Sequence, residues 1–166
     1  MKSKLIFTVL VFAAIASCNN KSDSKAKKDD TTMNSMHDMP ATNSNVPELP
    51  AIPEGAKVRF DNLKDGESVK SPFKVKMETE NIRVDTAGPV VAGSGHHHII
   101  IDGPDFLPAG EMVAKDSTHF HFGKGQKETE LTLSPGKHKL TLQFADGLHR
   151  SYGDKLSSTI TVNVKQ

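Results

Sequence analysis

The segment Lys139-Leu140-Thr141-Leu142-Gln143-Phe144 alternates polar and apolar residues, and this alternation decides the fold class. Successive side chains of a β-strand point to opposite faces, so the pattern predicts one buried face and one face in water. The same alternation recurs at residues 57–60, 73–78, 130–133 and 159–164. Turn signals separate these segments, and no stretch has a convincing helical period. We therefore expect an all-β fold, an antiparallel β-sandwich of immunoglobulin-like plan.

The predicted sandwich covers residues 54–166, a normal length for a domain with one hydrophobic core. The whole chain has 21 Lys and Arg against 20 Asp and Glu, so its net charge is +1. No basic patch indicates a nucleic-acid partner. The chain has no Trp and a single Tyr, which argues against an aromatic groove for sugars or peptides.

The N-terminus has the features of an export signal. Lys2 and Lys4 precede an apolar run that ends in Ile15-Ala16-Ser17-Cys18. The run has the length of a signal-peptide core and is too short to span a bilayer comfortably. The final four residues resemble the lipobox of bacterial lipoproteins, in which the cysteine carries a diacylglyceryl group.

We therefore expect a signal peptide at residues 1–17 and a lipid on Cys18 that anchors the protein to a membrane. The alternative is an ordinary secretory signal with a chance cysteine. The lipidated chain would belong to the bacterial cell envelope, facing the periplasm or the cell surface. Cys18 is the only cysteine, so the exported domain has no disulfide and no thiolate metal site.

Residues 18–53 are polar, contain few large apolar residues and predict a disordered tether. Within this tether lie Met33, Met36, His37 and Met39. Thioether sulfur is a soft ligand that suits Cu(I), and the motif resembles the Met-rich segments of bacterial copper-handling proteins. It predicts an auxiliary metal site, unless the methionines occur there by chance.

Seven of the eight histidines lie between residues 96 and 149, five of them in the clusters His96-His97-His98 and His119-Phe120-His121. Residues i and i+2 of a strand share a face and start about 6–7 Å apart. Two imidazoles at that spacing can bind one ion through bonds of about 2.0–2.1 Å. On a regular strand His97 must point to the face opposite His96 and His98.

The predicted metal ligands are His96, His98, His119 and His121, with His149 in a later loop as an additional ligand. Copper is the expected metal and zinc the alternative, because imidazole suits both. Binding requires neutral imidazole, so affinity should fall below about pH 6.5. The alternative to a metal site is a hydrogen-bonded histidine network that orders loops. His138 falls on the apolar face of its own strand and predicts a hydrogen-bonded core histidine.

Three stretches together resemble an uncharacterised family of exported bacterial domains, classed as a domain of unknown function. They are Gly93–Asp102 (GSGHHHIIID), His119–Gln126 (HFHFGKGQ) and Leu133–Asp146 (LSPGKHKLTLQFAD), the last followed by His149. The resemblance implies a periplasmic or surface β-domain and no known activity. A looser similarity, through Asp146 and His149, is to periplasmic copper-resistance sandwich proteins. Those proteins use a free N-terminal histidine as a ligand, where this chain has Cys18.

These observations favour a membrane-anchored envelope lipoprotein whose domain binds copper as a buffer or chaperone. A structural or binding module of the envelope without a metal is the first alternative. A metal-dependent enzyme is the second, and it is less favoured because no glutamate adjoins the histidine clusters and no hydrolase motif is present. The sequence does not identify a protein partner.

Overall fold

The computed structural model of the protein describes residues 46–166. The expected signal peptide, the lipidated Cys18 and the tether motif Met33, Met36, His37 and Met39 lie outside the described residues. Within residues 46–166, no helix has the length and hydropathy needed to cross a membrane.

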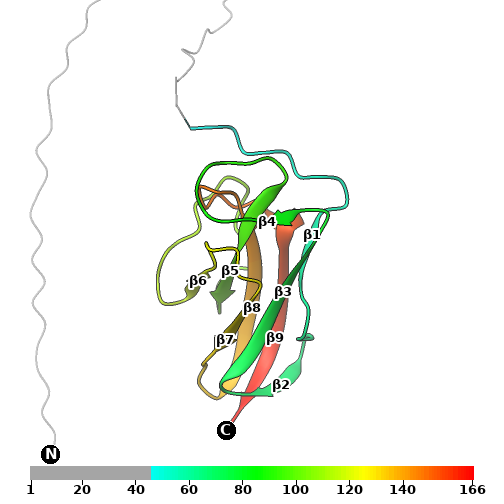
Figure 1. Cartoon of the computed structure of the whole chain (residues 1–166). Coiled ribbons are helices and arrows are strands. Elements are labelled where there is room, and N and C mark those ends of the chain that lie inside the picture. The colour runs from blue at the N-terminus through cyan, green and yellow to red at the C-terminus, as the bar shows by residue number, and fades with distance from the viewer. Residues whose placement is uncertain (1–45) are drawn as a thin grey trace, which may run out of the picture. The chain divides into compact units, whose positions relative to one another are not determined.

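Nine strands and one short 3-10 helix make up the domain (Figure 1). The strands are β1 (Lys57–Phe60), β2 (Glu67–Lys70), β3 (Phe73–Glu80), β4 (Arg83–Val84), β5 (Ser94–Ile101), β6 (His119–His121), β7 (Glu128–Leu131), β8 (Gly136–Ala145) and β9 (Ser157–Lys165). The 3-10 helix, η1, spans Asp154–Leu156 just before β9.

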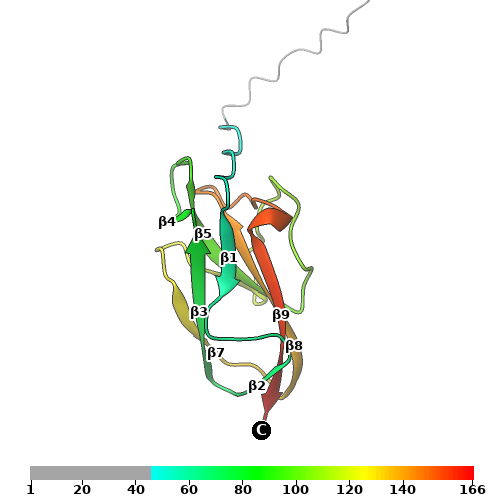
Figure 2. The same cartoon turned by 90° about the vertical axis from the view of Figure 1, so that its right-hand side faces the viewer.

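The strands form two sheets that pack as a sandwich (Figure 2). The smaller sheet has the order β1-β3-β7. The larger has the order β2-β9-β8-β5-β4, and β6 also pairs with β5 on the side away from β8. The all-β sandwich expected from the alternating segments is confirmed.

The larger sheet is mixed, whereas the sequence predicted antiparallel pairing throughout. β2 pairs with β9 in parallel, and β4 pairs with β5 in parallel. Residues 85–93 connect β4 to β5 and return the chain to the same end of the sheet, which allows the parallel pairing. Gly93, with a φ of 66°, closes this connection immediately before β5.

The core lies between the sheets and is built from the apolar positions of the alternating strands. Val75 and Met77 of β3 meet Leu140, Leu142 and Phe144 of β8, and all five are fully buried. Every residue of β5 is buried, as expected for a central strand covered on both faces. Gly95 allows β8 to approach closely, because a methyl group there would lie 2.2 Å from the carbonyl oxygen of Ala145.

The packed domain begins before residue 54, the boundary predicted from composition. Leu49 and Ile52 pack against the core, and Arg150 donates hydrogen bonds to the carbonyl oxygens of Pro47 and Glu48. These contacts hold residues that the sequence assigned to the tether. Leu49 and Ile52 are partly buried there, although their segment forms no strand.

Candidate metal centre

The register between β5 and β6 places the two histidine clusters side by side. His98 lies opposite His121 in this antiparallel pair, and Ile100 lies opposite His119. Because side chains alternate, His96 and His98 project from the face of β5 on which His121 projects from β6. Gly123 leaves room for the His121 ring, since a methyl group there would lie 2.3 Å from its Nε2.

A tight loop after β8 brings in His149. The buried carboxylate of Asp146 accepts hydrogen bonds from the backbone N–H groups of Leu148 and Arg150, at 2.9 Å each, and from Arg150 Nε at 2.8 Å. His149 adopts a φ of 67°, and its carbonyl oxygen accepts a hydrogen bond from Val113 N–H. The Asp146–Arg150 ion pair therefore fixes the loop conformation that turns His149 toward β5 and β6.

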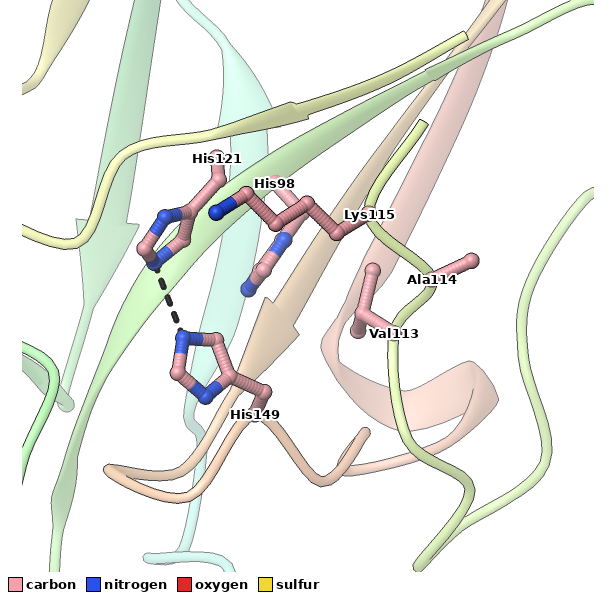
Figure 3. Close-up of a pocket in the computed structure, with 6 residues that line it drawn as sticks. All are labelled: His98, Val113, Ala114, Lys115, His121 and His149. Carbon is pink, nitrogen blue, oxygen red and sulfur yellow. Dashed lines mark hydrogen bonds between the residues drawn. The ribbon is translucent and has the colours of Figure 1, made fainter. Parts of the chain in front are cut away.

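Four imidazoles converge as a result, those of His96, His98, His121 and His149. The Nε2 atoms of His96 and His98 are 3.0 Å apart, and so are those of His121 and His149. Figure 3 shows the second of these contacts, with His98 beside it. One ring nitrogen from each of His96, His121 and His149 lies within 4.8 Å of the other two, so these three can hold one metal ion.

The spacing suits ligands of a transition metal. Bonds of about 2.0–2.1 Å in a tetrahedral site put ligand nitrogens about 3.3 Å apart. This separation lies between the 3.0 Å Nε2–Nε2 contacts and the 4.8 Å limit for His96, His121 and His149. Within residues 46–166, the side chains that converge closely enough to share an ion are all histidines, without a carboxylate. The site therefore contributes no negative charge to a bound cation.

Two buried nitrogens of this cluster have no hydrogen-bond partner. A neutral imidazole carries one proton, so the His96–His98 contact is a single N–H···N bond with Nε2 as donor on one ring and acceptor on the other. The two Nδ1 atoms are then one donor and one acceptor, and both are buried without a partner. An ion shared by the converging Nε2 atoms would leave these two Nδ1 atoms unpaired as well, so they do not distinguish a metal site from a structural network.

The buried imidazoles stay neutral far below the pH at which free histidine titrates. Burial, reinforced by the neighbouring imidazoles, lowers the pKa of His96 to about 4 and that of His98 to about 2. Burial, then His149, then Lys115 also lower the pKa of His121. The loss of affinity expected below about pH 6.5 holds for exposed imidazoles. Burial moves protonation of these three rings to lower pH, and it keeps their lone pairs available to a metal.

A small pocket gives access to the cluster. Its volume is about 250 Å³, and its walls are His98, Val113, Ala114, Lys115, His121 and His149. The Lys115 side chain extends across this pocket toward His121 (Figure 3). The pocket therefore combines three imidazoles, two short apolar side chains and one ammonium group.

His119 lies apart from the cluster although the sequence predicted it as a ligand. His119 lies opposite Ile100, which follows His98 by two residues on β5, so His119 is farther than His121 from His96. Its Nδ1 is 2.8 Å from Asp116 Oδ1, an oxygen that also accepts from the backbone N–H and the hydroxyl group of Thr118. The short β6 strand thus presents one histidine to the cluster and one to a surface turn.

His97 points to the opposite side of β5, as the alternation predicts. It packs against Phe144 with ring centroids 5.0 Å apart, and it is fully buried. Both of its ring nitrogens lack a hydrogen-bond partner, and burial lowers its pKa to about 3. His97 is therefore a neutral core residue and takes no part in the cluster.

His138 links two surface turns at the far end of β8. Its Nδ1 is 2.8 Å from Asp102 Oδ2, and its Nε2 is 3.0 Å from the carbonyl oxygen of Ser134. The hydrogen bond to Asp102 raises its pKa. Ser134 Oγ is 3.4 Å from the same Nε2, but that nitrogen faces a carbonyl acceptor and so carries a proton. The predicted hydrogen-bonded role is present, at a half-buried site, and the ring is no base for the serine.

Three residues that shape the site were not singled out as functional by sequence reasoning. Arg150 holds the His149 loop through Asp146, and Lys115 and Val113 line the pocket. An acidic residue four positions before an arginine in a turn was the available signal for the ion pair. Lys115 carried no signal, because the loop from residue 102 to 118 has no periodic pattern.

A model of the family described as Domain of unknown function (DUF4399) matches residues 75–165. This match covers more than half of the chain, and the chain belongs to this family. It includes β5, β6 and the His149 loop, and with them every member of the histidine cluster. No curated protein and no solved structure matches the chain.

Proposed function

We propose that this member of the family is a metal-binding lipoprotein of the bacterial cell envelope, which holds copper at His96, His121 and His149 and acts as a buffer or chaperone. His98 borders the same ion and serves as a fourth ligand or as a support for His96. The observation that carries the proposal is the convergence of four imidazole side chains, from two strands and a loop, beside a pocket.

Copper is favoured over zinc by the donor set. Imidazole binds both ions, and the affinity of a given nitrogen site is greater for Cu²⁺ than for Zn²⁺. The auxiliary motif of Met33, Met36, His37 and Met39 offers thioether ligands that suit Cu(I). A domain that receives or releases copper would use both donor types, one for each oxidation state.

The location of the protein is part of the proposal. The lipobox-like Ile15-Ala16-Ser17-Cys18 supports a lipid anchor on Cys18, and export would place the domain in the periplasm or on the cell surface. Replacing Cys18 by alanine should release the protein from the membrane fraction or leave it unprocessed. If Cys18→Ala sediments with membranes as the wild type does, another anchor is responsible.

The metal is tested with tag-free protein purified without nickel resin. Elemental analysis should find close to one equivalent of copper or zinc, and the metal-free protein should bind Cu(II) more tightly than about 1 μM. The double variant His121→Ala/His149→Ala removes the two more exposed ligands, so it should keep the fold and lose stoichiometric binding.

His119→Ala is the matched control. It removes a histidine two residues from His121 that pairs with Asp116, so copper affinity should stay within about twofold of the wild type. Equal copper affinity of the double variant and the wild type would show that the site lies elsewhere. If the wild type binds neither ion better than about micromolar, the histidines form a structural network and the envelope module without metal is the better description.

A further inference from the structure

Lys115 is an unusual neighbour for a cation site. It lines the pocket with His98, His121 and His149, and its side chain reaches over the cluster toward His121 (Figure 3). An ammonium group repels a metal cation, and the all-imidazole ligand set brings no negative charge to offset that repulsion. A bound metal would leave an uncompensated positive charge at the base of the pocket.

The nearby carboxylates are already engaged. Asp146 is fully buried and paired with Arg150, so its charge is taken up inside the loop. Asp116 faces His119 and Thr118 at the surface turn. Neither borders the pocket, whose walls carry cationic, neutral polar and apolar groups only.

We propose that the pocket binds a small carboxylate anion as an external ligand of the metal, with the Lys115 ammonium as its counter-ion. This inference rests on the proposed metal site. Three features of the pocket support it: the Lys115 side chain extends toward His121, His121 and His149 line the pocket, and the Val113 side chain provides an apolar wall (Figure 3). The carboxylate head would lie between Lys115 and the metal, and a short carbon chain would lie against the wall.

The volume limits the size of this ligand. About 250 Å³ is less than the usual 300–1,000 Å³ of sites for drug-sized molecules, so the pocket suits an anion of a few heavy atoms. Such a carboxylate belongs either to a free small acid or to an acidic side chain of another protein. The small volume and the neighbouring apolar wall favour the free acid.

The test uses the copper-loaded protein and acetate as the probe. Adding acetate to the Cu(II) form should shift its visible absorption and electron paramagnetic resonance spectra in a saturable manner. Lys115→Met should weaken acetate binding at least about tenfold, which corresponds to about 1.4 kcal/mol. Its Cu(II) affinity, measured without acetate, should be equal to the wild-type value or higher, because a repulsive charge has been removed.

Two further variants control for charge. Lys124→Met removes the same charge from an exposed position outside the pocket, and its acetate affinity should match the wild type. Lys115→Arg keeps the charge and should restore most of the acetate affinity. An acidic peptide in place of acetate distinguishes the two sources of the carboxylate: tighter binding of the peptide would point to an acidic side chain of a partner.

The outcomes separate this inference from the metal proposal. If the wild type takes up no metal, both fail. If it binds Cu(II) but acetate leaves the spectra unchanged, or if Lys115→Met binds acetate as tightly as the wild type, the anion site alone is refuted and the metal site stands.

Discussion

Replacing Asp146 by asparagine tests what holds the loop that carries His149. The carboxylate is fully buried, and two backbone N–H groups and Arg150 Nε donate to it. Asparagine keeps one oxygen for the two N–H donors. Its amide group, however, turns a donor toward the guanidinium of Arg150, whose side chain is only 12% exposed and loses its counter-charge.

The size of the effect follows from this geometry. Removing one partner of a buried ion pair costs about 3–5 kcal/mol, because the other charge stays buried and unpaired. Arg150 retains the carbonyl oxygens of Pro47 and Glu48 as acceptors, which places the expected loss at the lower end, about 3 kcal/mol. For a domain of about 120 residues this lowers the melting temperature by about 10–15 °C.

The measurement is urea unfolding of the metal-free protein at neutral pH, followed by circular dichroism. Asp105→Asn is the control, because the Asp105–Lys139 pair is 70% and 37% exposed and should contribute less than about 1 kcal/mol. In an Arg150→Met background the Asp146→Asn change should cost much less, since the orphaned cation is gone. A loss below about 1 kcal/mol for Asp146→Asn, or an equal loss in both backgrounds, would refute the assigned role of the ion pair.

Three other substitutions follow from the described contacts. His97→Leu should raise the unfolding free energy by about 1–3 kcal/mol, because it removes two buried, unpartnered ring nitrogens; a decrease would reveal a hidden partner. Gly95→Ala should lower it by about 3 kcal/mol or more, since the methyl group meets the carbonyl oxygen of Ala145; retention of wild-type stability would contradict the close β5–β8 approach. His138 has a raised pKa in the folded state, so its contribution is complete below its unfolded pKa of about 6.5 and is lost as pH rises through the folded value. Wild-type stability relative to His138→Gln should therefore shrink as the pH rises above about 6.5, and a constant difference would show that Asp102 does not retain the proton on the ring.

The strands were predictable because their signal is local. Alternation at Leu140, Leu142 and Phe144 depends only on the two-residue period of an extended chain, and the same rule separated His97 from His96. The parallel pairs of the larger sheet depend on contacts between distant segments, which no local pattern encodes. The packing of Leu49 likewise depends on a partner surface that only the folded domain provides.

The candidate site was predictable in part for the same reason. The His-x-His spacing indicates which imidazoles share a face, but the β5–β6 register decides that His121 joins the cluster and His119 does not. A shift of two residues in one direction would place His119 opposite His98 and His121 opposite His96, without changing the pattern of either strand. His149 depends on a positive φ held by Asp146, which the sequence marks only as an acidic residue near a turn.

The hydrogen bonds from Arg150 to Pro47 and Glu48 have a mechanical consequence. Any tension on the N-terminal part of the chain enters the folded domain at these two carbonyl groups and reaches the guanidinium first. That guanidinium is bonded to Asp146, and His149 lies on the same five-residue loop. A force applied to the chain before Pro47 therefore acts on the loop that carries His149. Such a force would displace this imidazole before it disturbed either sheet.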